Sequence, residues 1–246
     1  MSDPVSDPPG RARPIAIVTG GASGLGAAIA ARLERDHYQV AIADIASDDP
    51  VDVTSDAEVK ELVYETVERY GRLDVLVCSA AVETRSKLVD CTDEDWQRVL
   101  DVNVKGPFLC MRHAIPAMAA SGGGSVVLMS SILGAIGSPD YAAYCASKGA
   151  LNNLAKQAAV ESAPDNVRVN VVAPSATDTG LFMQMIAKTP DPDAIVAMVA
   201  GRTPMKRLGT ADEVADTVAF LCSPGAGYIS GAIIAVDGGM AARRVV

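Results

Sequence analysis

Short runs of apolar, mostly β-branched residues alternate with longer helix-like patterns along this chain of 246 residues. Runs that are apolar on both faces and separated by helices are typical of a parallel sheet covered on both sides. The pattern therefore predicts an α/β fold, a doubly wound parallel sheet of about seven strands, in a single domain over residues 14–246. The expected strands are 15–19, 40–44, a short run at 51–54, 75–79, 125–130, 167–172 and 233–236.

The helix-like patterns fall at 26–35, 56–70, 93–120, 141–161 and 210–221. Pro107 and Pro116 lie inside the third of these, where proline is expected to kink or break a helix. Thr210 is a good N-cap for the last one, because acidic residues follow it in the first turn. Residues 1–13 hold several prolines, serines and aspartates before any apolar run, which predicts a disordered tail.

The charge balance excludes several classes of partner. The chain has 21 basic and 30 acidic residues and a formal net charge of −9, which is a poor basis for binding nucleic acid or an anionic membrane. The chain has five cysteines, an odd number, and no two of them form a C-x-x-C pair. We therefore expect reduced thiols in a cytoplasmic protein and no metal site. The uncharged stretch 14–31 resembles a membrane span, but its glycines are poor helix formers, and we reject that interpretation.

A glycine-rich loop follows the first predicted strand and begins the first helix. Gly20, Gly24 and Gly26 would permit a tight turn and close approach of a pyrophosphate to the helix N-terminus, although ordinary strand–helix turns also use such glycines. Asp44, at the end of the second strand, can accept hydrogen bonds from an adenosine ribose diol and would repel a 2′-phosphate. Because Ser23 adds no cation to the loop, the pattern favours NAD over NADP.

The most specific pattern is Tyr144-Cys-Ala-Ser-Lys148 with Ser131 upstream. Residues i and i+4 share a helix face, so Tyr144 and Lys148 can point into one site. An ammonium ~4 Å from a phenolate stabilises it by about 4 kcal/mol before desolvation, which predicts a lowered pKa for Tyr144 and a role as general acid/base. Ser131 ends the fifth predicted strand, where a doubly wound sheet presents its ligands.

These motifs resemble the short-chain dehydrogenase/reductase family over about residues 14–240, which implies a Rossmann-type fold. The resemblance implies that Tyr144 is the acid/base, that Ser131 positions substrate and that Lys148 binds the nicotinamide ribose. It also implies that Asn103, in the segment D-V-N-V, holds a water of a proton relay through its backbone carbonyl. The implied cofactor-binding residues are Gly20, Ser23, Gly24, Leu25, Gly26, Asp44, Asp52, Val53, Ala80, Tyr144, Lys148, Pro174, Thr177 and Thr179.

The sequence departs from the family pattern at three places. The usual N-N-A-G after a central strand is Cys78-Ser-Ala-Ala81, which removes side-chain hydrogen bonds near the adenosine. Pro174-Ser175 replaces Pro-Gly, and Thr177 stands where an aliphatic residue is common. Residues 45–50 are too few for the helix that usually joins the second and third strands, so we expect that helix to be missing.

The resemblance predicts an NAD-dependent oxidoreductase that acts on a secondary alcohol or a ketone, with a small and mainly apolar substrate. It also implies a homotetramer. Two alternatives stay open: a 3-oxoacyl-(acyl-carrier-protein) reductase-like enzyme, against which Asp44 argues, and a non-catalytic NAD-binding sensor. Residues 179–207 are long, irregular and rich in methionine, which predicts a substrate lid; they could equally pack on the core or on a neighbouring subunit.

Overall fold

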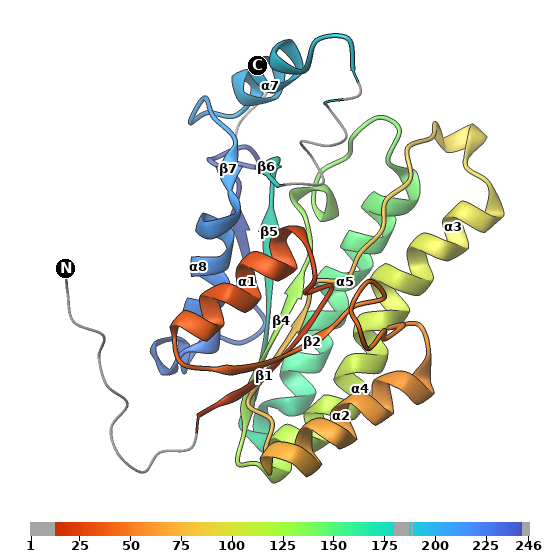
Figure 1. Cartoon of the computed structure of the whole chain (residues 1–246). Coiled ribbons are helices and arrows are strands. Elements are labelled where there is room, and N and C mark those ends of the chain that lie inside the picture. The colour runs from red at the N-terminus through yellow and green to blue at the C-terminus, as the bar shows by residue number, and fades with distance from the viewer. Residues whose placement is uncertain (1–12, 180–186, 188, 243–246) are drawn as a thin grey trace.

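A six-stranded parallel sheet forms the centre of the molecule, with strand order β2-β1-β3-β4-β5-β8 (Figure 1). The computed structural model describes residues 13–179, 187 and 189–242. The predicted Rossmann-type, single-domain α/β fold is confirmed. The sheet strands are β1 (Ile15–Thr19), β2 (Gln39–Ala43), β3 (Val75–Cys78), β4 (Gly124–Met129), β5 (Val167–Pro174) and β8 (Ile233–Val236). The short strands β6 (Thr177–Asp178) and β7 (Gly209–Thr210) pair with each other outside this sheet.

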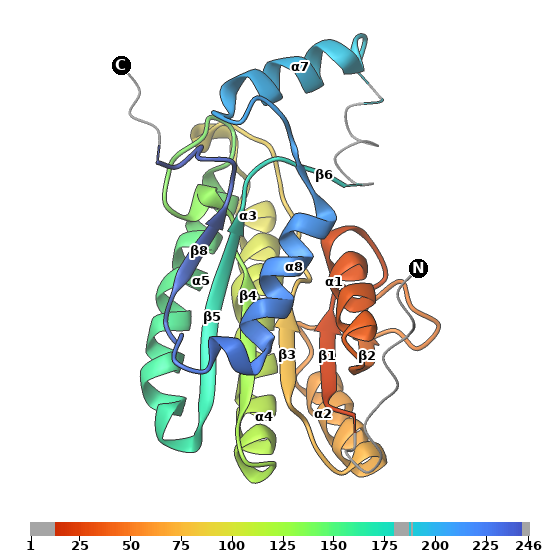
Figure 2. The same ribbon diagram turned by 90° about the vertical axis from the view of Figure 1, so that its left-hand side faces the viewer.

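Helices cover both faces of the sheet (Figure 2). The helices α1 and α8 lie together on one face, whereas α2, α4 and α5 cover the other. Helix α7 lies beyond the carboxyl ends of the strands. The bounds are α1 (Gly24–Arg35), α2 (Asp56–Tyr70), α3 (Asp93–Leu100), α4 (Gly106–Ala120), α5 (Ala142–Ser162), α7 (Pro192–Arg202) and α8 (Ala211–Cys222).

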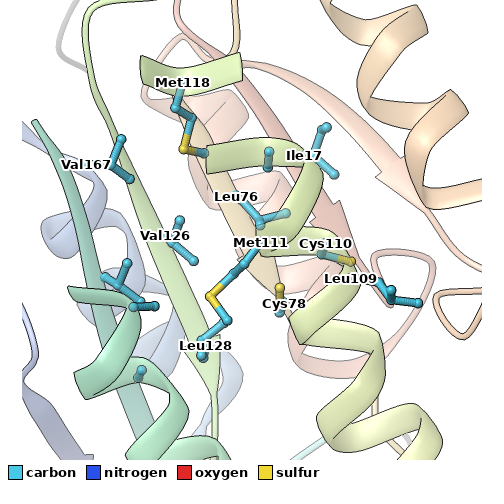
Figure 3. Packing of buried hydrophobic residues seen from close by; sticks show 14 of the residues in the cluster. Ile17, Leu76, Cys78, Leu109, Cys110, Met111, Met118, Val126, Leu128 and Val167 are labelled. Atoms are coloured by element: carbon cyan, nitrogen blue, oxygen red, sulfur yellow. The ribbon is translucent and has the colours of Figure 1, made fainter. Parts of the chain in front are cut away.

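The core consists of two layers because successive strand residues point to opposite faces. In β1, Ile17 packs towards α2 and α4, while Ala16 and Val18 pack towards α1 and α8. Figure 3 shows the first layer, in which side chains of β3 and β4 meet Met111 of α4. The two-sided apolar strands predicted from the sequence therefore fill both layers.

The sheet has one strand fewer than predicted, because residues 51–54 form a turn before α2. The carboxylate of Asp52 accepts hydrogen bonds from the backbone N–H and the hydroxyl of Thr54, both at 2.8 Å. Such a local side-chain-to-backbone bond competes with strand pairing. As predicted, no helix occurs in residues 44–55. Because residues 51–54 form no strand, β2 is an edge strand.

The long helical pattern at 93–120 contains α3, a π-helical segment at Asp101–Lys105 and α4. Pro107 lies in the first turn of α4, where its missing N–H is tolerated. Pro116 was expected to kink or break the helix, and it does not break it, because α4 continues past it to Ala120. Thr210 caps α8 as predicted, in a reciprocal arrangement with Glu213.

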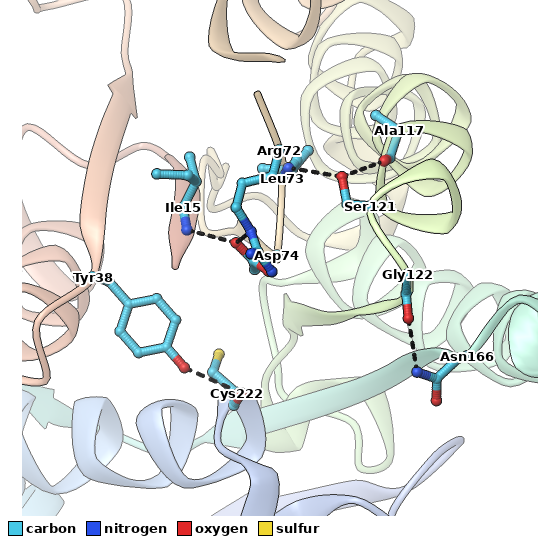
Figure 4. A network of polar contacts seen from close by, with 10 residues as sticks. All are labelled: Ile15, Tyr38, Arg72, Leu73, Asp74, Ala117, Ser121, Gly122, Asn166 and Cys222. Carbon is cyan, nitrogen blue, oxygen red and sulfur yellow. Dashed lines mark hydrogen bonds and ion pairs between the residues drawn. The ribbon is translucent and has the colours of Figure 1, made fainter. Parts of the chain in front are cut away.

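Polar contacts fix the amino ends of the central strands, opposite the glycine loop (Figure 4). The Asp74 carboxylate accepts a hydrogen bond from the backbone N–H of Ile15 at 2.8 Å and pairs with the guanidinium of Arg72. The hydroxyl of Ser121 accepts from Leu73 N–H at 3.2 Å and so connects this end of β3 to the end of α4. The candidate site residues lie at the opposite, carboxyl ends of these strands.

Parts of two sequence predictions lie outside the described residues. Of the predicted tail at 1–13, residues 1–12 are not described, and of the predicted lid at 179–207, residues 180–186 and 188 are not described. The described part of the lid includes α7. None of the described helices combines the length and the apolar character that crossing a membrane requires.

Candidate active site

Most of the candidate site residues follow the carboxyl ends of the parallel strands. Because all six strands run in the same direction, these ends share one edge of the sheet. The strand order reverses at β1, which lies between β2 and β3, and crevices at such a switch point are the usual ligand sites of doubly wound folds. Five predicted residues follow or end strands at this edge: Gly20, Asp44, Ala80, Ser131 and Pro174.

The glycine loop lies at the switch point and approaches β3 closely. Gly20 has φ +67°, and a Cβ there would lie 2.7 Å from Cα of Ala80. A Cβ on Gly26 would lie 2.0 Å from the carbonyl oxygen of Gly20, whereas one on Gly24 would meet open space. Ser23 is the N-cap of α1 but its side chain forms no capping hydrogen bond. The backbone N–H groups of this first turn, including that of Leu25, therefore suit an anion such as a pyrophosphate.

Asp44 lies against the glycine loop, immediately after β2. Its carboxylate accepts hydrogen bonds from the backbone N–H groups of Ala22 at 3.0 Å and Ala46 at 2.9 Å. The two bonds fix the carboxylate beside the loop, and each oxygen keeps lone pairs for further donors. This arrangement fits the ribose diol that the sequence predicts for this position.

Hydrogen bonds from the segment after β3 to Thr19 hold this segment in place, although it lacks the two asparagines that are usual in the family at this position. The Thr19 hydroxyl accepts hydrogen bonds from the backbone N–H groups of Ser79 at 3.1 Å and Ala80 at 3.2 Å. Nearby, Val53 is buried, and a Cβ on Gly106 would lie 2.9 Å from its side chain. Val53 therefore ties the turn that holds Asp52 to the start of α4.

Tyr144 and Lys148 lie on one face of α5, as their spacing predicts. The Lys148 side chain is fully buried: its Nζ lies 5.4 Å from the centre of the Tyr144 ring and donates a hydrogen bond to Met129 O at 2.8 Å. Ser131 follows β4, and its hydroxyl accepts a hydrogen bond from Leu133 N–H at 3.2 Å. A side-chain hydrogen bond joins Ser131 to Tyr144. The structure thus brings the three predicted side chains together.

The pKa of Tyr144 differs from the sequence prediction, which was a lowered value. Burial, together with the negative charge of Glu83, raises it to about 12, although the hydrogen bond with Ser131 acts in the opposite direction. Burial also lowers the pKa of Lys148 to about 8. The predicted direction was wrong because the attraction between the two groups was taken before desolvation, and desolvation is the larger effect on both.

Asn103 lies in the π-helical segment before α4 and is buried. Its side-chain amide accepts from Val82 N–H and donates to Val82 O, both at 2.8 Å. It also donates to the Ser147 hydroxyl at 3.1 Å, which in turn donates to Tyr144 O at 2.7 Å. Asn103 therefore connects α4, α5 and the loop after β3.

Ser147, Val82 and Ser130 were not singled out by the sequence. Ser147 lies three residues after Tyr144, one helical turn along the same face, and this spacing is the one signal that could have identified it. Ser130, which the alternation of strand side chains separates from Ser131, is buried and donates to Lys148 O at 3.2 Å. These residues hold α5 in place relative to the sheet.

Of the residues predicted after β5, Thr177 and Thr179 lie outside the main sheet. Pro174 ends β5, and Thr177 is buried in β6, where its hydroxyl donates to Ser175 O at 3.0 Å. The N–H of Ser175, which replaces the usual glycine, donates to Val236 O at 3.2 Å, so the backbone tolerates this replacement. Thr179 follows β6 and is partly exposed.

Comparison with known proteins shows the same pattern over nearly the whole chain. A family model described as enoyl-(acyl carrier protein) reductase matches residues 20–241. The cis-4-hydroxycyclohexanecarboxylate dehydrogenase of Sinomonas cyclohexanicum is 38% identical over an alignment that covers 93% of this chain and 96% of that protein. A 3-oxoacyl-(acyl-carrier-protein) reductase of Thermotoga maritima is 34% identical over 92% of this chain and 97% of its own.

The chain belongs to the short-chain dehydrogenase/reductase family. Among solved structures, the ligand-free aldohexose dehydrogenase of Thermoplasma acidophilum superposes with a TM-score of 0.91 at 32% identity, over 95% of this chain and 96% of that one. A structure described as ElxO with NADP bound gives a TM-score of 0.88 at 28% identity, over 94% of this chain and all of that one. Members of this family are oxidoreductases that use a nicotinamide cofactor. The glycine loop, Asp44 and the first turn of α1 are the groups that fit such a dinucleotide here.

Proposed function

We propose that this short-chain dehydrogenase/reductase transfers a hydride between NAD and a secondary alcohol or ketone, with Tyr144 as general acid/base. The observation that carries the proposal is the burial of a lysine beneath a tyrosine: Lys148 Nζ lies 5.4 Å from the Tyr144 ring at the carboxyl edge of the sheet. Burying an ammonium is costly. A purely structural lysine at this position has no evident reason to be there, whereas a lysine that holds a positive charge beside a reacting tyrosine does.

The reaction can be derived from the protein groups alone. When bound, the cofactor donates or accepts a hydride at the carbon that carries the reacting oxygen. A phenol with a raised pKa is neutral at pH 7 and can donate its proton to a carbonyl oxygen during reduction. In the opposite direction the deprotonated, phenolate form of Tyr144 takes the proton of the alcohol, while Ser131 orients the same oxygen by a hydrogen bond.

A panel of secondary alcohols, monitored at the NADH absorbance, tests this function. The names of the relatives suggest starting with cyclic alcohols, since one acts on a hydroxycyclohexanecarboxylate and another on an aldohexose. NADH formation with any member supports the proposal. A protein that binds NAD but oxidises no alcohol and reduces no ketone would instead be the non-catalytic sensor.

A 3-oxoacyl-(acyl-carrier-protein) reductase is the alternative within the same chemistry. Relatives with that name are 34% identical to this chain, and the neutral phenol of Tyr144 suits reduction. Asp44 argues against it, because such reductases usually use NADPH. Reduction of a 3-oxoacyl thioester with NADPH, faster than any oxidation with NAD, would favour this alternative.

Cofactor selectivity gives a separate prediction about Asp44. We expect NAD to bind at least tenfold more tightly than NADP, because the Asp44 carboxylate repels the 2′-phosphate of NADP. A repulsion of about 1.4 kcal/mol is enough for a tenfold difference in affinity. Isothermal titration of both cofactors measures it, and Asp44→Ala should narrow the difference. Equal or tighter binding of NADP by the wild-type chain would contradict the prediction.

We also propose that the chain forms a homotetramer, as the family resemblance implies. Apolar side chains are exposed on the helices and the strand expected at the interfaces: Phe108 on α4, Val160 on α5 and Ile233 on β8. Burying such residues against a second copy removes apolar surface from water. Light scattering at micromolar concentration should give four times the chain mass, and Val160→Glu should reduce it. A monomeric mass for the wild type would refute the assembly.

A further inference from the structure

The loop after β3 contains a short segment, Val82–Ser86, that is held at both ends beside the catalytic side chains. At one end, Val82 forms two hydrogen bonds of 2.8 Å with the Asn103 amide. At the other, Ser86 N–H donates to Asp140 O at 3.0 Å, and Ser86 pairs with Tyr141 in a parallel bridge. Because Tyr141 directly precedes α5, the three residues between these anchors pass beside the end of α5 that carries Tyr144.

Two charged side chains, Glu83 and Arg85, lie between the anchors and are exposed. The Arg85 guanidinium already has a partner, since it lies 5.3 Å over the Tyr141 ring, which contacts the Tyr144 ring edge-on at 6.1 Å. The Glu83 carboxylate forms no hydrogen bond or ion pair with the part of the chain that the structure describes. Its charge nevertheless reaches both rings: after burial, Glu83 is the next cause of the raised pKa of Tyr144 and of Tyr141.

We infer that Glu83 determines substrate specificity by accepting a hydrogen bond from a second hydroxyl group of the substrate, next to the carbon that is oxidised. This inference rests on the proposed function and adds a substrate class to it: cyclic or linear polyols and sugar-like alcohols, in place of the mainly apolar alcohol that the sequence predicts. A carboxylate can only accept hydrogen bonds, so a simple alcohol leaves it without a partner.

The charges of the segment decide between a neutral and a charged substrate. Glu83 disfavours a substrate carboxylate near Tyr144, because two like charges would face each other in a partly desolvated site. Arg85, two residues along the same segment, disfavours a substrate ammonium. The two charges balance, which leaves a neutral hydroxyl as the donor that the segment accepts best.

A matched pair of substrates tests the inference, with cyclohexanol and 1,2-cyclohexanediol as probes and NAD as cofactor. We expect kcat/KM of the wild type to be at least about tenfold higher for the diol, since sites that bond a substrate hydroxyl discriminate against analogues that lack it. Glu83→Ala should abolish the preference by lowering kcat/KM for the diol at least about tenfold. Glu65→Gln, on the exposed face of α2, is the control and should keep the wild-type preference.

A second measurement does not depend on turnover. The pKa of Tyr144 is obtained from the tyrosinate absorbance as the difference between each protein and its Tyr144→Phe derivative. Glu83→Gln should lower this pKa because a nearby negative charge is removed, whereas Glu65→Gln should not. The groups that act on Tyr144 are Lys148, whose Nζ lies 5.4 Å from its ring, and Glu83, Ser131, Tyr141 and Cys145. Glu83 is the only carboxylate among them.

The outcomes separate this inference from the proposed function. An unchanged Tyr144 pKa in Glu83→Gln, or a diol preference that survives Glu83→Ala, overturns the inference while the oxidoreductase assignment stands. Faster oxidation of an amino alcohol or a hydroxy acid than of the diol also overturns it. If no alcohol is oxidised, the proposed function fails. Calorimetric binding of the diol, and its loss in Glu83→Ala, then still decides the role of Glu83.

Discussion

Tyr144→Phe should lower the rate of alcohol oxidation by about two to four orders of magnitude, because a positioned acid/base contributes roughly 10²- to 10⁴-fold. The substitution removes the hydroxyl and keeps the ring, so the edge-on contact with Tyr141 and the position of Lys148 beneath it are retained. Steady-state kinetics with the best alcohol of the panel measures the loss.

The control for this variant is cofactor binding, which we expect to change by less than about threefold, since the glycine loop and Asp44 are untouched. Tyr141→Phe serves as a matched variant, because it removes the hydroxyl of the neighbouring ring of the same pair. A Tyr144→Phe protein that keeps more than about a tenth of the wild-type rate would show that another group moves the proton.

Lys148→Met should abolish activity and, at pH 7, raise the free energy of unfolding by about 2 kcal/mol. Burial lowers the pKa of Lys148 from 10.5 to about 8, and each pKa unit corresponds to ~1.4 kcal/mol, so the buried charge destabilises the folded state by about 3 kcal/mol. Methionine removes this cost but also the hydrogen bond to Met129 O, which is worth ~1 kcal/mol.

The stability difference between Lys148→Met and the wild type should depend on pH in a predictable direction. Between the folded pKa of about 8 and the unfolded value of 10.5, the unfolded wild type binds more protons at Lys148 than the folded one, so its stability rises with pH there. The advantage of Lys148→Met should therefore be constant below pH 8 and shrink from pH 8 to 10.5. Urea denaturation at several pH values measures it. A variant less stable than the wild type at pH 7 would contradict this prediction. It would mean that the contacts of the lysine side chain stabilise the folded state by more than the buried charge destabilises it.

How much could be predicted differs between the sheet and the site. The strands were predictable because consecutive residues such as Ile17 and Val18 are apolar and lie on opposite faces of the same strand. This pattern can be recognised in the sequence without knowledge of the tertiary structure. The turn at 51–54 was not, because its apolar residues resemble a strand and the competing bonds of Asp52 depend on local geometry. Tyr144 and Lys148 could be placed together from helical spacing alone, but the balance between attraction and desolvation at that pair depends on the elements packed around it.

Contacts between distant segments were beyond the sequence for the same reason. The hydrogen bonds of Asn103 to Val82 and Ser147 join three segments of the chain, and no local sequence pattern predicts these contacts. Thr19, which orders the residues after β3, likewise acts across sixty positions of sequence. Glu83 is an ordinary surface residue in the sequence, and it becomes a candidate for specificity only once its loop is seen to be anchored on both sides.

The π-helical segment at Asp101–Lys105 makes the spacing of this region intolerant of single-residue deletions. A π turn accommodates one residue more than an α turn, so deletion of one residue there would let the chain continue as plain α-helix. Helix α4 would then keep nearly the same phase relative to α3, and the change would fall on the turn that carries Asn103. Asn103 would lose its two hydrogen bonds with Val82. Length variation among homologous chains should accordingly collect in the loops on either side and avoid this stretch.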